Sequence, residues 1–172
     1  MDERVFSIST PIPPDNEFVT YRPSLSLQDS ALFEKANEVK ALNVHWTFRS
    51  GLLRQVAGVA ELKVHLYPAH ENEIKSSADL RAELLSAFKR ELVKVGYTGG
   101  PVQFYRVVIN GRTWLTYEVP VIGVREFAIA VSDTRYLTVQ LAYIDNTREK
   151  PAAWRKEAAE LMEKVIGSIR VD

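Results

Sequence analysis

The sequence predicts an α+β protein, a single-domain α/β/α sandwich whose mainly antiparallel sheet is covered by two helices. Two patterns predict it. Residues 102–144 contain four successive β-type runs joined by short turns, which indicates an antiparallel meander. Residues 76–95 and 151–169 repeat apolar side chains at helical spacing, so each segment has one apolar face that the sheet can bury.

Size and composition indicate one domain spanning residues 1–172. A chain of this length can bury a core without a disulfide or a metal ion, and the absence of cysteine excludes thiolate zinc sites and cysteine nucleophiles. Pro11, Pro13 and Pro14 interrupt the first strand-like residues, because proline lacks the N–H that a sheet ladder requires. We therefore expect residues 1–23 to form a looser N-terminal strand region.

The charge balance argues against several classes of partner. Lys plus Arg and Asp plus Glu both number 22, whereas nucleic-acid binding usually rests on a basic surface. No segment approaches the ~20 apolar residues that a membrane-spanning helix requires, and the N-terminal residues lack the apolar stretch of a secretory signal. We expect a cytoplasmic protein with no nucleic-acid partner and no membrane insertion.

The first half of the chain is expected to contribute two paired strands. Residues 42–49 and 59–67 alternate apolar and polar side chains, which is typical of half-buried strands, and consecutive strands usually pair. Residues 27–39 are ambiguous. Leu32, Phe33 and Ala36 fit helical spacing there, so the sequence predicts a short helix.

Residues 76–95 form the clearest helix of the sequence. Ser76 and Asp79 have the spacing of a capping box, and Gly96 is placed to end the helix. The apolar stripe, widened by Leu85, consists of Leu80, Leu84, Phe88, Leu92 and Val95. The charged residues of the helix are expected to face solvent: Arg81, Glu83, Lys89, Arg90, Glu91 and Lys94.

The meander and the closing helix follow. Asn110-Gly111 predicts a type I′ turn, because both residues tolerate the positive φ that this turn needs. The third and fourth runs are apolar on both faces in places, so we expect both faces of the sheet to be covered. The buried stripe of the closing helix is expected to consist of Trp154, Ala158, Leu161, Met162, Val165 and Ile169.

Three stretches resemble those of a known family: Ile109-Asn110-Gly111-Arg112, Tyr136-Leu137-Thr138-Val139 and Val165-Ile166-Gly167-Ser168-Ile169. With the order of strands and helices around them, they make residues 76–170 similar to the PsbP-like superfamily, which includes Mog-like and bacterial DcrB-type proteins. The resemblance implies an α/β/α sandwich and a binding or assembly role. It implies no shared active site and no cofactor.

An aromatic and basic set in the meander is the candidate partner-binding surface: Tyr105, Arg106, Trp114, Tyr117, Arg125 and Tyr136. These residue types are enriched at binding hot spots, although they are also ordinary strand residues. Because side chains alternate between the two faces of a sheet, some members of the set must belong to the core.

Other constellations are weaker candidates. His45, His65 and Glu61 lie on the polar faces of two strands expected to pair, and two imidazoles with a carboxylate are a plausible metal set. Two histidines on a mixed polar surface need no metal, however, so no metal site is predicted. Glu118 and Glu126 stand near strand ends, where carboxylates are commonplace. No nucleophile elbow, phosphate loop or His-Glu-x-x-His motif occurs.

The sequence thus favours a non-catalytic module that binds another protein as an adaptor, chaperone or inhibitor, with a homodimer as a further assembly. Two alternatives remain open. One is a small metal-dependent enzyme that uses His45, His65 and Glu61. The other is a small-molecule carrier with a cavity between sheet and helices.

Overall fold

Seven strands form one antiparallel sheet in the order β2-β3-β4-β8-β7-β6-β5. The structure is a computed structural model, and it describes residues 6–7, 19–28, 39–50, 53, 55–70, 73–94, 101–119, 124–145 and 152–171. The sheet strands are β2 (Val19–Gln28), β3 (Val39–Ser50), β4 (Gln55–Pro68), β5 (Tyr105–Ile109), β6 (Arg112–Val119), β7 (Val124–Ser132) and β8 (Arg135–Asp145). The helices are α1 (Ser77–Lys94) and α2 (Ala152–Ser168), and a separate two-stranded ladder joins β1 (Phe6–Ser7) to β9 (Arg170–Val171).

The predicted meander is confirmed, and it is one half of a larger sheet. Strands β5, β6, β7 and β8 pair consecutively, and Asn110 and Gly111 have φ values of 51° and 76°, as their turn requires. The last meander strand then pairs with β4, with Leu141 opposite Leu62. This long-range pairing joins the meander to the predicted β3–β4 pair.

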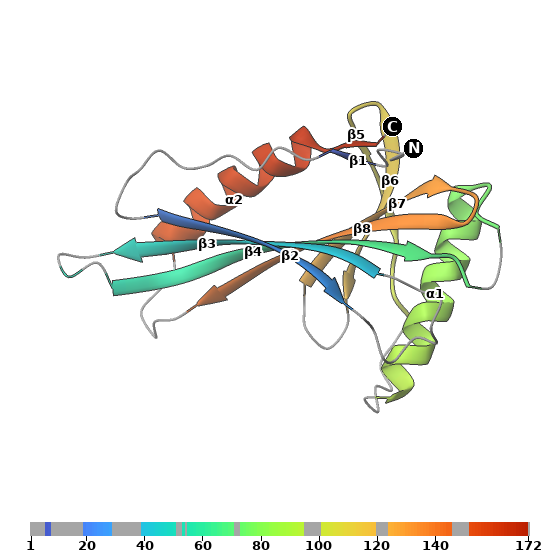
Figure 1. The fold of residues 1–172 in the computed structure, drawn as a ribbon, viewed down its shortest axis with the longest axis horizontal. Helices are drawn as coiled ribbons and strands as arrows, with labels where there is room; N and C mark the ends of the chain where they lie inside the picture. The colour runs from blue at the N-terminus through green and yellow to red at the C-terminus, as the bar shows by residue number, and fades with distance from the viewer. Residues whose placement is uncertain are drawn as a thin grey trace.

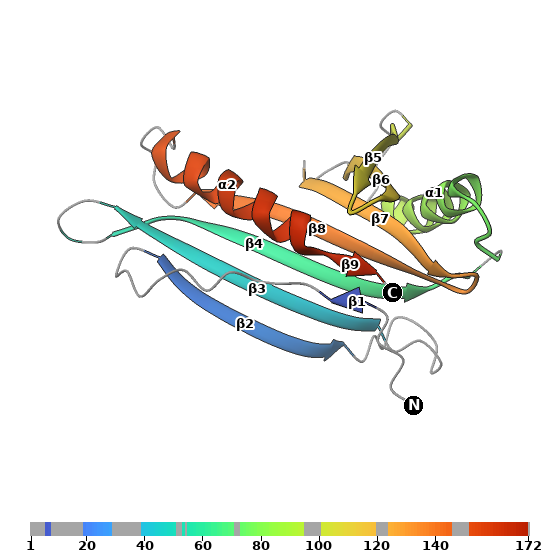
Figure 2. The same cartoon turned by 90° about the horizontal axis from the view of Figure 1, so that it is seen from above.

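The two helices pack against different faces of the sheet (Figures 1 and 2). In Figure 1, α2 lies above the strands and α1 lies below their right-hand ends. Side chains of α2, among them Met162 and Val165, join one core cluster with Trp46 and Leu62 of β3 and β4. Side chains of α1, including Leu84, join a smaller cluster with residues of β6, β7 and β8. A sheet with helices is therefore the architecture.

The β5–β6 turn also contacts the C-terminal end of α2. The side-chain amide of Asn110 donates hydrogen bonds to the carbonyl oxygens of Gly167 at 2.9 Å and Ile169 at 2.5 Å. Carbonyls at the end of a helix lack intrahelical partners, and Asn110 satisfies these two together with Arg170, whose Nη1 donates to Gly167 O at 3.1 Å and to Ile169 O at 3.2 Å. Two of the three stretches that carry the family resemblance therefore meet in space.

The N-terminal end of α1 has the predicted cap. Ser76 Oγ accepts a hydrogen bond from the Asp79 amide at 3.2 Å, and the Asp79 carboxylate accepts one from the Lys75 amide at 3.1 Å. The carboxylate also accepts a hydrogen bond from the Ser76 hydroxyl at 2.8 Å. These contacts fix the start of the helix and hold Asp79 at the cap.

The prediction of a short helix over residues 27–39 is wrong at both ends. Leu27 and Gln28 belong to β2 and Val39 to β3, while residues 29–38 lie outside the described part of the chain. Strand β2 also continues through Pro23. Because β2 is an edge strand of this sheet, one of its sides needs no ladder N–H, and proline is tolerated there.

Two residues of α1 are placed differently from their predicted faces. Leu85, expected in the buried stripe, is 37% exposed, whereas Glu83, expected in solvent, is only 1% exposed. The Glu83 carboxylate accepts a hydrogen bond from the backbone N–H of His70 at 3.0 Å. A buried carboxylate needs such partners, so Glu83 ties the start of the helix to the segment that follows β4.

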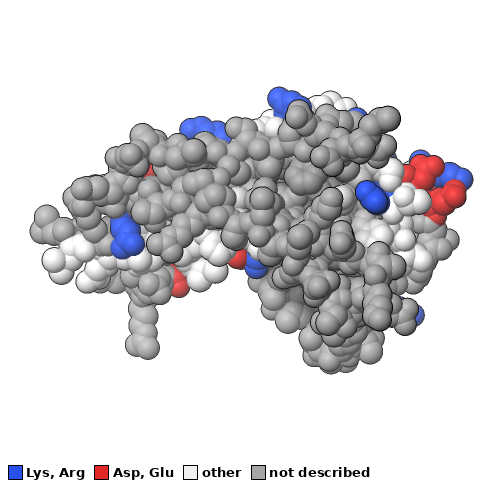
Figure 3. All heavy atoms as spheres, in the orientation of Figure 1, with Lys and Arg blue, Asp and Glu red and all other residues white. Residues whose placement is uncertain are grey.

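Neither helix of the described residues has the length and apolarity needed to cross a membrane. Figure 3 shows that, among the described residues visible on this side, basic and acidic side chains are scattered rather than gathered into one basic patch.

Candidate binding surfaces

The strand register brings together only two of the three residues considered as metal ligands, Glu61 and His45. Glu61 is directly opposite His45, and Oε1 of Glu61 lies 2.8 Å from Nε2 of His45. Oε2 of the same carboxylate lies 2.9 Å from Nζ of Lys63. Burial opposes the ionisation of Glu61, but the hydrogen bonds from Lys63 and His45 outweigh it and lower its pKa. Glu61 is thus part of a polar surface network.

His65 does not join His45. It pairs with Ala41 in the register, and its ring lies 5.5 Å from that of Tyr67. Burial and the nearby charge of Lys63 lower its pKa. Within the described ranges, no group of three or more His, Cys, Asp or Glu side chains is arranged to hold a metal ion.

The carboxylate pair considered from the sequence is also separated. Glu118 is opposite Arg125, whereas Glu126 is opposite Tyr117, so the two carboxylates point to different faces of the sheet. Burial raises the pKa of Glu126 despite its hydrogen bond with Tyr117. Burial and the Glu126 charge likewise raise the pKa of Tyr117 well above its usual value. A glycosidase-type pair needs both carboxyls on one substrate, and this geometry does not provide it.

The aromatic and basic set of the meander does not form one surface. Trp114, Tyr117 and Tyr136 are 1%, 2% and 3% exposed. Trp114 belongs to the core on the α2 side, and the two tyrosines belong to the core on the α1 side. Tyr105, 60% exposed, and Arg106 lie on the edge strand β5, while Arg125 lies on β7. Only these last three residues can meet a partner without unfolding.

One groove lined by described residues lies between α2 and strands β6, β7 and β8, with a volume of about 640 Å³. Its apolar lining comes from Val124, Phe127, Leu141, Ala142, Ile144, Ala159, Met162 and Ile166. Its polar lining comes from Glu118, Arg125, Tyr143, Arg155 and Glu163. We call this surface the α2 groove.

Charges on the rim of the α2 groove are largely matched. Both carboxylate oxygens of Asp145 accept hydrogen bonds from Arg155, which is a fork-like pair. Arg125 is opposite Glu118 in the register. Tyr143 packs its ring against Trp154 with centroids 6.4 Å apart, so the rim next to α2 is held in place.

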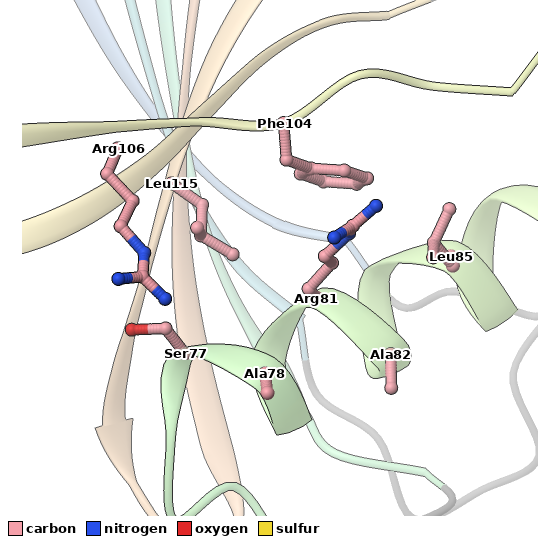
Figure 4. Close-up of a pocket in the computed structure, with 8 residues that line it drawn as sticks. All are labelled: Ser77, Ala78, Arg81, Ala82, Leu85, Phe104, Arg106 and Leu115. Atoms are coloured by element: carbon pink, nitrogen blue, oxygen red, sulfur yellow. The ribbon is translucent and has the colours of Figure 1, made fainter.

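Another groove lined by described residues, of about 330 Å³, lies between α1 and the start of β5. Figure 4 shows its lining, which consists of Ser77, Ala78, Arg81, Ala82, Leu85, Phe104, Arg106 and Leu115. The guanidinium of Arg81 lies 5.7 Å from the centroid of the Phe104 ring. We call this surface the α1 groove.

The edge of β5 is a third exposed feature. Of the described strands, only β6 pairs with β5. Val108 is 68% exposed and Tyr105 is 60% exposed, so apolar side chains lie beside an unpaired strand edge. Such edges can accept a strand from another chain.

Sequence patterns did not reveal most of these groove residues. Arg81 was assigned to a solvated helix face, and Phe104, Tyr143 and Arg155 carried no motif. Their placement depends on which helix face meets which strand, and only the tertiary structure supplies that information. The exposed aromatic and basic residue types were the one usable signal, and they identified Arg106 and Arg125.

No protein-family model, curated protein or solved structure matches this chain. The geometry of the grooves and of the strand edge is therefore the basis on which a function is argued.

Proposed function

We propose that the protein is a non-catalytic protein-binding module of the adaptor, chaperone or inhibitor type, and that it buries an apolar segment of its partner in the α2 groove. The observation that carries the proposal is an open groove of about 640 Å³ with an apolar floor and Arg and Tyr side chains at its rim. Protein interfaces commonly combine such a floor with a polar rim.

The floor of the groove is already formed. Phe127, Leu141 and Met162 are buried members of the core, so their positions are fixed before a partner arrives. Tyr143 is 36% exposed beside them, which leaves aromatic surface for a partner to cover. A preformed floor reduces the ordering cost of binding.

The rim favours a particular kind of segment. Because Arg155 is held by Asp145 and Arg125 is opposite Glu118, the rim presents both signs of charge in fixed places. An amphipathic helix with an apolar face and mixed charges along its borders suits this arrangement. The charges would set orientation more than affinity.

The family and location inferred from the sequence belong to the same proposal. A PsbP-like α/β/α sandwich is supported by helices that pack against different faces of one sheet and by the contact between Asn110 and the end of α2. A cytoplasmic location is part of the proposal, and cell fractionation tests it.

The test compares capture of a partner by tagged variants. Tyr143→Asp places a charge in the α2 groove, and Val108→Asp is the control, an exposed apolar residue on β5. We expect the partner captured by the parent from native lysate to bind Tyr143→Asp at least tenfold more weakly, because a central contact of the groove can be worth more than 1.4 kcal/mol. Val108→Asp should retain it. The reverse pattern would move the interface to the β5 edge, and unchanged binding by both variants would reject the groove.

A homodimer is a second assembly favoured by one observation, the exposed apolar edge of β5. Two copies could pair through this edge and continue the sheet. Light scattering at increasing protein concentration measures the mass, and Val108→Asp should shift a dimer towards monomer. A constant monomer mass would remove this arrangement.

The metal-dependent alternative has less support from the geometry. Glu61 is engaged by His45 and Lys63, and His65 lies with Tyr67 instead. Elemental analysis of protein purified without chelator, before and after His45→Ala, is the direct test. A stoichiometric metal lost in this variant would revive the alternative.

A further inference from the structure

We propose that the α1 groove binds a small amphiphilic anion, a carboxylate or phosphate head joined to an apolar body. The inference is independent of the proposed function, because this groove lies on the face of the sheet that α1 covers and the α2 groove lies on the other. It rests on the pairing of two cations with an apolar floor.

The first observation is that the two arginines of this groove form no ion pair within the described part of the chain. Arg81 of α1 and Arg106 of β5 both line the groove, and no side chain in the described ranges forms an ion pair with either. Two guanidinium groups at one small groove favour an external anion, and Arg matches the geometry of carboxylate and phosphate oxygens.

The second observation is the floor between them. Leu115 is 4% exposed and is opposite Arg106 in the register, while Leu85 is 37% exposed on the helix side. Phe104 packs against Tyr117, with ring centroids 5.0 Å apart, and this contact fixes the aromatic wall. An apolar body placed here would lose contact with water against side chains that the core already holds.

The third observation concerns the positions of the polar groups. Figure 4 shows the Arg106 guanidinium turned towards the Ser77 hydroxyl, while Arg81 lies next to the Phe104 ring. Ser77 and Ala78 begin α1, where the helix dipole favours negative charge. Asp79 does not line the groove, because the cap hydrogen bonds hold its carboxylate. The head group would therefore lie near Arg106 and Ser77, with its apolar body over Leu115 towards Leu85.

Groove size and charge together define the ligand class. A volume of about 330 Å³ is at the small end of ligand sites, so the ligand has the size of a medium-chain acid or an aryl acid. A purely apolar ligand would leave both guanidinium groups without an anion, and a small inorganic anion would leave the floor exposed. Only a molecule with both parts uses the whole groove.

The first experiment is calorimetric titration of the full chain with four probes that share one chain length. Octanoate and octyl phosphate carry the anionic head, while octanol and octylammonium keep the apolar chain without it. We expect saturable binding of at least one anionic probe, at least tenfold tighter than octanol, and no binding of octylammonium. The ratio between octanoate and octyl phosphate shows which head group is preferred. Equal binding of octanol, or equal binding of inorganic phosphate alone, would overturn the proposal.

The second experiment locates the site. Arg106→Gln and Arg81→Gln remove one cation each, and Arg112→Gln is the matched control, an exposed arginine of β6 that does not line the groove. We expect Arg106→Gln, which removes the cation beside the head group, to bind the preferred probe five- to thirtyfold more weakly, Arg81→Gln to lose less affinity, and the control to bind as the parent does. Amide shifts in the parent should concentrate at residues 77–85 and 104–106. An equal loss of probe affinity in all three variants, or amide shifts concentrated at the α2 groove, would contradict the assignment of the site to the α1 groove.

Discussion

The two faces of the sheet are built differently. The face under α2 carries one continuous apolar cluster that reaches from Phe48 of β3 to Ile109 of β5 and includes four buried side chains of α2 together with Ile169, the residue after the helix. The face under α1 carries a smaller cluster, and polar groups such as Glu83, Glu126 and Thr138 are buried or partly buried within or beside it. Beyond α1, this face becomes the polar network of His45, Glu61 and Lys63.

The two faces therefore contribute different properties, one most of the buried apolar surface and the other most of the groups with shifted pKa values. Burial of apolar surface is the main source of stability, and most of it lies on the α2 side. The titratable groups with shifted pKa values lie mainly on the α1 side, among them Glu61, His65, Tyr117 and Glu126. Four predictions test this contrast, from the largest expected effect to the smallest.

Leucine truncation on each face compares the two cores directly. Leu62 is 0% exposed on the α2 side and Leu84 is 3% exposed on the α1 side. We expect Leu62→Ala to lower the free energy of unfolding by about 4 kcal/mol and Leu84→Ala by about 2 kcal/mol, since a larger core leaves a cavity that collapses less. Chemical denaturation measures both values. A cost for Leu84→Ala as large as that for Leu62→Ala would contradict the contrast.

Gly58 tests how closely α2 is seated on β4. A Cβ atom at this position would overlap the indole ring of Trp154, which is itself buried. We expect Gly58→Ala to cost about 1–3 kcal/mol, because overpacking forces side chains or backbone to move. Gly167→Ala is the control in α2, where a Cβ meets nothing within 4 Å, and it should be neutral or stabilising by up to about 1 kcal/mol. A neutral Gly58→Ala would mean that Trp154 moves freely.

The helix caps compare a long-range contact with a local one. Asn110→Gly preserves the positive φ of the turn but removes the two hydrogen bonds to the end of α2, so we expect a loss of about 1–2 kcal/mol. Ser76→Ala removes only the local cap of α1 and should cost about 1 kcal/mol or less. Thermal unfolding ranks the two variants. The opposite ranking would place the stronger cap on the α1 side.

Replacing Glu126 and replacing Glu61 should change the pH dependence of the free energy of unfolding in opposite directions. At any one pH, this is the smallest of the four effects. The pKa of Glu126 is raised in the folded state, so its contribution to stability is lost as the pH rises from the ordinary glutamate range through the raised value. The pKa of Glu61 is lowered, so its contribution is present above the ordinary range and lost as the pH falls. Relative to the parent, Glu126→Gln should therefore gain stability as the pH rises from 4 to 7.

Over the same range Glu61→Gln should lose stability relative to the parent. Denaturation at several pH values gives both slopes, and the parent run in parallel removes the contribution of every other group. If both variants showed slopes of the same sign relative to the parent, the pKa values of the two carboxylates would not be shifted in opposite directions.

Local patterns in the sequence determined most of the elements. Alternation identified β3, β4 and the meander, helical spacing identified α1 and α2, and Asn110-Gly111 identified the turn with its positive φ values. These features depend on neighbouring residues, so the sequence alone carries them. The helix predicted over residues 27–39 is wrong because Leu27 and Val39 take their conformation from the pairing of β2 with β3 rather than from helical spacing.

The tertiary structure alone decided the pairing of β8 with β4, the faces met by the two helices and the burial of Glu83. It also decided that Trp114 is core while Arg106 and Arg125 line different grooves, and that Arg81 meets Phe104. Each of these outcomes depends on groups far apart in the chain. Their positions follow from which packing buries the most apolar surface while most buried polar groups keep a partner, and no local pattern encodes that choice.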